Sequence, residues 1–184
     1  MPSSQNDCRD KMIMKSSTSK NVSLYGLLTV AALLFGYVEY LVPLNFNAPG
    51  IKLGISNGVI LFLIINKKYK AAILINIARI LLSALLFVGP FSLLFSLIAG
   101  VVSTGIMIIL NCFKGFGIVG ISALGGTVHN LVQLLVAYFT VGAGVIFYLP
   151  FLLFAGILAG IIVGFLVWIM VNKFSKNKTS EGRE

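Results

Sequence analysis

Long apolar runs, interrupted only by short basic clusters, fill most of this chain and limit what it can fold into. Hydrophobic residues make up 58% of the 184 residues, and charged residues only 10%. A soluble domain carries about 25% charged residues, because much of its surface faces water. So few charges could not cover a water-soluble globule. The sequence therefore predicts an integral membrane protein.

Six apolar segments are candidates for membrane-spanning helices. A helix needs about 20 apolar residues to cross about 30 Å of hydrocarbon. By that measure we expect spans at residues 23–43, 53–66, 71–88, 91–112, 117–141 and 146–171. The second segment is short and begins beside polar residues, so we expect a partial or tilted span there. The predicted fold class is an all-α bundle of six transmembrane helices.

Polar segments flank this membrane part. We expect residues 1–22 to form an N-terminal tail, residues 23–172 the six-helix domain and residues 173–184 a basic C-terminal tail. The first apolar run has full spanning length and no small-residue cleavage site, which argues against a cleaved signal peptide. Residues 44–54 contain Pro and Gly and are expected to form a structured loop that dips back toward the bundle.

The distribution of basic residues predicts the orientation. With six spans both termini lie on one side, which carries twelve Lys and Arg, whereas the other side carries only Lys52. The positive-inside rule then predicts a multi-pass protein of the cell membrane with both termini in the cytoplasm. Basic residues beside helix ends also meet anionic lipid head groups. Nucleic acid is not an expected partner, because the motifs that read it are missing.

Polar side chains within or beside the spans carry the information about function. A charge at the bilayer centre costs about 2.5–3.5 kcal/mol on insertion scales, so it is expected to face a partner or a cavity. The candidate ligand-binding residues are Glu39, Lys52, Asn57, Arg79, His129, Asn130 and Gln133. We expect them to meet in the outer half of the bundle, around one cavity that opens to the outside.

A structural role is the main alternative for these side chains. Polar residues form hydrogen bonds between membrane helices, and Glu39 and Arg79 could form an ion pair that holds the bundle together. The group of seven is nevertheless larger than packing alone would need.

Catalysis is not expected from this chain. Glu39 is the only acidic residue outside the tails, whereas metal-assisted chemistry needs clustered carboxylates or His and Cys ligands. Cys8 and Cys112 lie far apart and have no metal-type spacing. Nucleotide-binding and hydrolase motifs are also missing. We therefore predict no catalytic residue, no metal site and no cofactor held by this chain.

Small residues recur at four-residue spacing on two spans, a pattern that lets helix backbones approach closely. On the last span these are Gly156, Gly160 and Gly164, for which packing inside the bundle is the favoured interpretation. On the first span they are Ala32 and Gly36, which could equally form a surface that docks another membrane protein.

Five sequence blocks resemble one known family. They are PGIKLGISN (49–57), Arg79, SLIAG (96–100), GGTVHNLVQ (125–133) and YLPFLLFAG (148–156), and the stretch EYLVP (39–43) fits as well. Over about residues 24–170 the chain resembles the Gx transporter family, also named heptaprenyl diphosphate synthase component I. That family is similar to the substrate-binding S components of energy-coupling-factor transporters.

The resemblance implies a function and a set of partners. It implies a six-helix protein with both termini inside and an outward-facing site, which docks a transmembrane coupling protein and two ATPase subunits. Docking through small residues of the first helix would place Ala32 and Gly36 at that interface, and the partner subunits would use the ATP. The expected ligand is a small vitamin-like or isoprenoid-related molecule.

The ligand charge and two other functions stay open. Lys52 and Arg79 outweigh Glu39, which favours an anionic or zwitterionic ligand. The alternative function is a membrane accessory subunit linked to heptaprenyl diphosphate synthesis. A purely structural scaffold would explain the glycine repeats but not the buried polar group.

Overall fold

The structure is a computed structural model that describes residues 22–38, 41, 56–113 and 115–181. An N-terminal helix covers Val22–Val38. The following helices are α2 (Asn57–Ile65), α3 (Tyr69–Ser83), α4 (Pro90–Cys112), α5 (Ile118–Val141) and α6 (Leu149–Glu181). A π-helix, η1 (Ala84–Val88), extends α3, and a 3-10 helix, η2 (Ala143–Tyr148), precedes α6. The prediction of an all-helical fold is confirmed for the described residues.

Four helical segments of the described chain are long and apolar enough to cross a membrane. They are Tyr69–Phe87, Leu93–Cys112, Ile118–Thr140 and Ala143–Lys173, which match the last four predicted spans. Within the described ranges the N-terminal helix is shorter, and α2 has only 9 residues. At 1.5 Å per residue α2 is about 14 Å long, or about half of the hydrocarbon thickness. The second apolar segment is therefore a half-span in the described part of the chain.

A polar turn ends α2 and starts α3. Lys67 has a positive φ of 58°, the left-handed conformation that stops a helix. The Asn66 amide Nδ2 donates to the Phe62 carbonyl at 2.7 Å, and the Lys68 N–H donates to the Leu63 carbonyl at 2.9 Å. These bonds satisfy carbonyl groups of the last turn, so the chain can reverse direction into α3.

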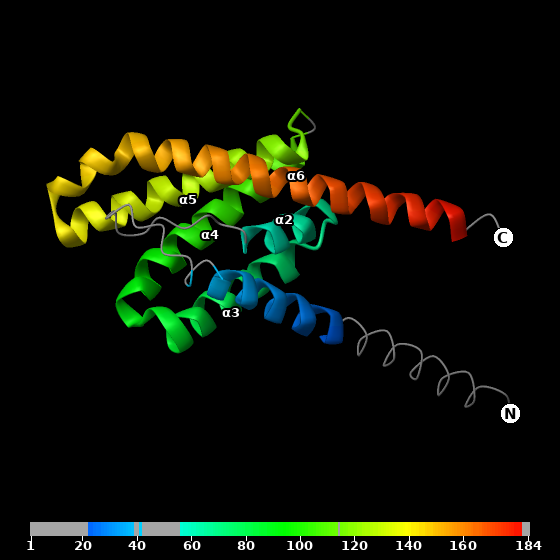
Figure 1. Ribbon diagram of the computed structural model, residues 1–184, viewed down its shortest axis with the longest axis horizontal. Helices are drawn as coiled ribbons and strands as arrows, with labels where there is room; N and C mark the ends of the chain where they lie inside the picture. The colour runs from blue at the N-terminus through cyan, green and yellow to red at the C-terminus, as the bar shows by residue number, and fades with distance from the viewer. Residues whose placement is uncertain (1–21, 39–40, 42–55, 114, 182–184) are drawn as a thin grey trace, which may run out of the picture.

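The bundle has two distinct ends. Figure 1 shows α5 and α6 side by side, with their connection at one end of the molecule. The start of the N-terminal helix and the end of α6 both lie toward the other end, beyond which α6 projects (Figure 1). We call that end, where Lys67, Lys68 and Lys173 lie, the basic end. The tail predicted from residue 173 continues as helix to Glu181.

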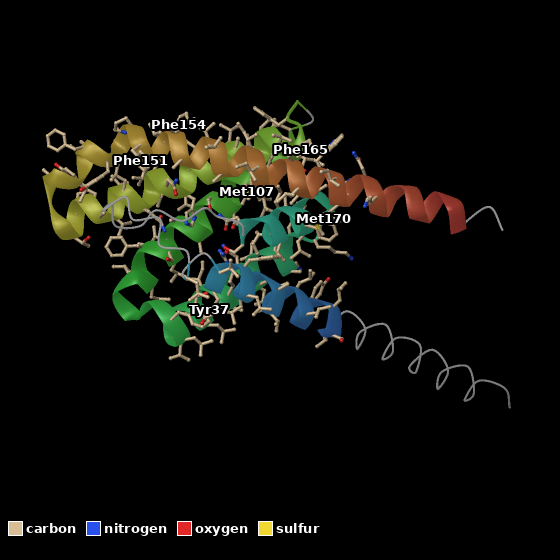
Figure 2. The ribbon with its side chains drawn as sticks, in the orientation of Figure 1. Tyr37, Met107, Phe151, Phe154, Phe165 and Met170 are labelled. Carbon is tan, nitrogen blue, oxygen red and sulfur yellow. The ribbon has the colours of Figure 1, made fainter. Side chains whose placement is uncertain are left out.

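Helix α2 lies in the hydrophobic core rather than at its edge. Its buried side chains Ile60, Leu61, Leu63 and Ile64 form one cluster with residues of the four long helices. The partners in that cluster are Ala72, Ile75, Met107, Ile121 and Val167. Figure 2 shows Met107 in the middle of the bundle. A half-span is thus surrounded by full-length helices, which shelter it from lipid.

The glycines of α6 form a close contact with α5. A Cβ atom at Gly160 would lie 2.6 Å from the Cα of Ala123, and one at Gly164 would lie 2.8 Å from the Cα of Val119. Side chains at these positions would push the two backbones apart. The interpretation of this repeat as packing inside the bundle is confirmed.

The small residues of the N-terminal helix also face the bundle, and the docking role predicted for Ala32 and Gly36 stays a prediction. Ala32 is 0% exposed, and a Cβ at Gly36 would lie 3.7 Å from the Ser83 hydroxyl. At the next residue, the Tyr37 ring lies 4.8 Å from the Phe87 ring. Ala32 is therefore covered by its own bundle in this structure.

The orientation remains a prediction that labelling can test. Cysteines introduced at Lys67 and at Gly144, both exposed, should react with impermeant maleimide from opposite sides of the membrane. We expect the Lys67 position to be cytoplasmic, because it lies at the basic end. Labelling of both positions from the same side would refute the arrangement.

Candidate ligand site

Arg79 lies near the middle of the candidate membrane span Tyr69–Phe87 and at the centre of a layer of buried polar side chains. It is 10 residues from the start of α3 at the basic end, or about 15 Å, which is about half of the hydrocarbon thickness. Its side chain is 8% exposed. A charge at that depth is costly, so its surroundings decide whether the fold tolerates it.

The guanidinium of Arg79 binds the start of α2. Its Nη1 donates to the Ser56 hydroxyl, and its Nη2 donates to the Asn57 Oδ1 at 3.1 Å. Helix α2 begins at Asn57 and has no capping side-chain bond from its N-cap residue, Ser56. Arg79 thus holds the first turn of α2 in place.

Asn76 extends the layer from α3 to α4. Its Oδ1 accepts a hydrogen bond from Arg79 Nη2 at 2.8 Å. Its Nδ2 donates to the Gly100 carbonyl at 3.0 Å and to the Thr104 hydroxyl at 2.9 Å. A Cβ at Gly100 would lie 2.5 Å from Ile80 Cδ1 and 3.2 Å from Asn76 Nδ2, so a larger residue would displace these side chains. The amide of Asn76 therefore links Arg79 to the backbone of α4.

Ser103 carries the layer from α4 to α5. Its hydroxyl contacts the Gly100 carbonyl at 3.2 Å and His129 Nδ1 at 3.4 Å. Both side chains are buried, with exposed fractions of 1% and 8%. Helices α2, α3, α4 and α5 are therefore joined by one chain of hydrogen bonds near the bilayer centre.

Asn130 and Gln133, the other two predicted residues on α5, differ in their hydrogen bonding. Asn130 faces α6, and its Nδ2 donates to the Leu152 carbonyl at 3.0 Å. Gln133 lies one turn beyond His129 and is 4% exposed. Its amide oxygen Oε1 is enclosed and has no hydrogen-bond partner among the residues described. The two amides thus differ: one joins helices, and the other has an unused acceptor.

The structure joins three of the seven predicted ligand residues in one network. Asn57, Arg79 and His129 belong to the hydrogen-bonded chain, and Asn130 and Gln133 adjoin it on α5. Glu39 and Lys52 lie outside the described residues, as does the predicted loop at 44–54. The members on α3 and α5 are buried in this conformation rather than exposed on an open cavity.

Four members of the layer were not among the predicted site residues: Ser56, Asn76, Ser103 and Thr104. Asn76 could have been found, because it precedes Arg79 by one helical turn and so shares its face. The Ser103-Thr104 pair lies in a mainly apolar span that also contains Ser92, Ser96 and Asn111. Hydroxyls in helices commonly bond their own backbone, however, so the pair alone does not indicate a site.

The fold and this buried layer define a helical membrane protein whose polar groups converge at mid-depth around one arginine. The chain belongs to the heptaprenyl diphosphate synthase component I family, because the model of that family matches residues 28–170. The resemblance inferred from the sequence blocks is thereby confirmed. Comparison of the chain with curated proteins and with solved structures gave no match.

Proposed function

We propose that this chain is the substrate-binding membrane subunit of an energy-coupling-factor type importer, and that it binds a small anionic or zwitterionic molecule. The observation that carries the proposal is the polar layer around Arg79. Hydrogen bonds alone would hold helices together without a charge, and a charge at mid-depth is by default a functional feature.

Arg79 is suited to bind an anionic group. Its two terminal nitrogens contact neutral oxygens of Ser56, Asn57 and Asn76. A carboxylate or phosphate forms stronger, charge-assisted hydrogen bonds with a guanidinium and can engage both nitrogens at once. An anionic ligand would therefore compete with Ser56 and Asn57 for the same fork, while Asn76 keeps its contact.

The partners belong to the proposal as well. A coupling protein and two ATPases would supply the energy, and the basic end would lie against anionic lipid in the cytoplasmic leaflet. Because Ala32 is buried, docking is assigned to no particular surface of the N-terminal helix.

The family description names one alternative, a membrane accessory component linked to heptaprenyl diphosphate synthesis. Affinity purification of the tagged protein from gently solubilised membranes separates the two functions. We expect a transmembrane coupling protein, ATPase subunits and a retained small molecule, all identified by mass spectrometry. Recovery of a soluble prenyl synthase subunit, without ATPases, would instead establish the accessory role.

A further inference from the structure

Gln133 adjoins the polar layer on α5, and its enclosed amide oxygen has no hydrogen-bond partner among the residues described. A buried acceptor without a donor is unfavourable, and in a native protein it calls for an explanation. The neighbouring amide of Asn76 does not share the feature, because its Oδ1 accepts a hydrogen bond from Arg79 Nη2 at 2.8 Å. Among the amides described, the unused oxygen therefore marks one position on α5.

The helix register places Gln133 at the depth of Arg79. Helices α4 and α5 are antiparallel, with Met107 opposite Gly125 and Ser103 opposite His129. One further turn along α5 sets Gln133 opposite Ala99, which is 0% exposed. On the other flank of α4, Ile80 lies against Gly100, and Arg79 precedes it. Gln133 and Arg79 thus flank α4 at one level, where its buried residues Ala99 and Gly100 are small.

We propose that Gln133 accepts a hydrogen bond from a hydroxyl or N–H group of the ligand whose anionic end binds Arg79. The inference rests on the proposed function and narrows its ligand class. The ligand is then a small carboxylate or phosphate that carries a polar donor away from its charge. A polyprenyl diphosphate does not fit, because its hydrocarbon tail has no donor to offer.

Matched probes test the donor requirement directly. Hexanoate and 6-hydroxyhexanoate share a carboxylate and differ in one terminal hydroxyl. Thermal unfolding of the full-length protein in detergent, titrated with each probe, reports both affinities. We expect the wild type to bind the hydroxy acid about tenfold more tightly, as one hydrogen bond to a buried acceptor allows.

Gln133→Met distinguishes a ligand contact from a structural one. Methionine has a similar length and no unsatisfied acceptor, so the ligand-free variant should unfold at a higher temperature than the wild type. It should also lose the preference for the hydroxy acid. The matched control is Asn111→Leu, because the Asn111 Nδ2 donates to the Ile64 carbonyl and the Tyr69 hydroxyl, both at 3.1 Å. That variant should unfold at a lower temperature and keep the preference.

Each remaining outcome overturns the inference in a recognisable way. Equal affinity of the wild type for both probes refutes the donor requirement but leaves anion binding intact. Binding of neither probe counts against the proposed function as well. A Gln133→Met variant that is destabilised like Asn111→Leu would show that the amide serves the fold, for example through a buried water.

Discussion

Arg79→Ala should release the first turn of α2 and lower the stability of the whole bundle by about 2–3 kcal/mol. The variant leaves three oxygens without their donor, on Ser56, Asn57 and Asn76. A hydrogen bond between membrane helices contributes about 0.6 kcal/mol on average and up to about 1.7, while stranded buried groups cost more. Hydrogen exchange of the α2 amides and thermal unfolding in detergent measure the two effects.

Two further variants sharpen this prediction. Arg79→Lys keeps the charge but lacks the planar fork, so it should also free the start of α2 and bind anions poorly. Lys70→Ala is the control on the same helix, because Lys70 is exposed at the basic end and its loss should change stability by less than about 0.5 kcal/mol. Unchanged exchange in α2 after Arg79→Ala would contradict the role given to this residue.

A double variant tests the ion pair that the sequence left open. If Glu39 is paired with Arg79 only to hold the bundle, removing one charge strands the other. Glu39→Ala combined with Arg79→Ala should then restore the stability lost in the single variant. We expect no such rescue, because the hydrogen bonds to α2 stay broken in both.

Gly160→Ala should separate α5 from α6 and destabilise the protein by about 2 kcal/mol. The new methyl group would meet the Ala123 Cα and the Ser122 carbonyl oxygen at 2.6 Å, and backbone atoms cannot rotate away. Overpacking of this kind costs about 1–3 kcal/mol, which exceeds the gain of up to about 1 kcal/mol in helix propensity.

The control for this change is Gly105→Ala in α4. A Cβ at Gly105 meets nothing within 4 Å, so the propensity gain should act alone and raise stability by up to about 1 kcal/mol. Thermal unfolding of both variants beside the wild type gives the comparison. A Gly160→Ala protein as stable as Gly105→Ala would mean that α5 and α6 are not in close contact.

Hydropathy located the long helices well and indicated a partial span at the short one. Length and apolar composition suffice for a helix that must cross the whole hydrocarbon, and the last four spans followed from them. Helix α2 is apolar on every side because protein surrounds it. Sequence periodicity cannot distinguish such a helix from one that faces lipid. Its polar start at Ser56 and Asn57 was the available signal of a shortened span.

The candidate site shows a similar limit. Arg79 and His129 could be found because a titratable group in an apolar span is rare. Which way Ala32 and Gly36 face could not be predicted, because packing within a bundle and docking of a partner both need small residues. Helix register decides which hydroxyls and amides contact Arg79, and a single sequence does not reveal how the helices are aligned.

The burial of α2 bears on the order in which this protein can assemble. At 9 residues the helix is too short to hold a place in a bilayer by itself, and a Cβ at Gly58 would lie 3.1 Å from Val163 of α6. The ribosome makes α2 about a hundred residues before that neighbour exists. The apolar half-helix α2 therefore lacks its packing partners until the longer helices have inserted. A nascent chain that stops before α6 lacks one wall around α2, so a premature end there should mark the product for membrane proteolysis.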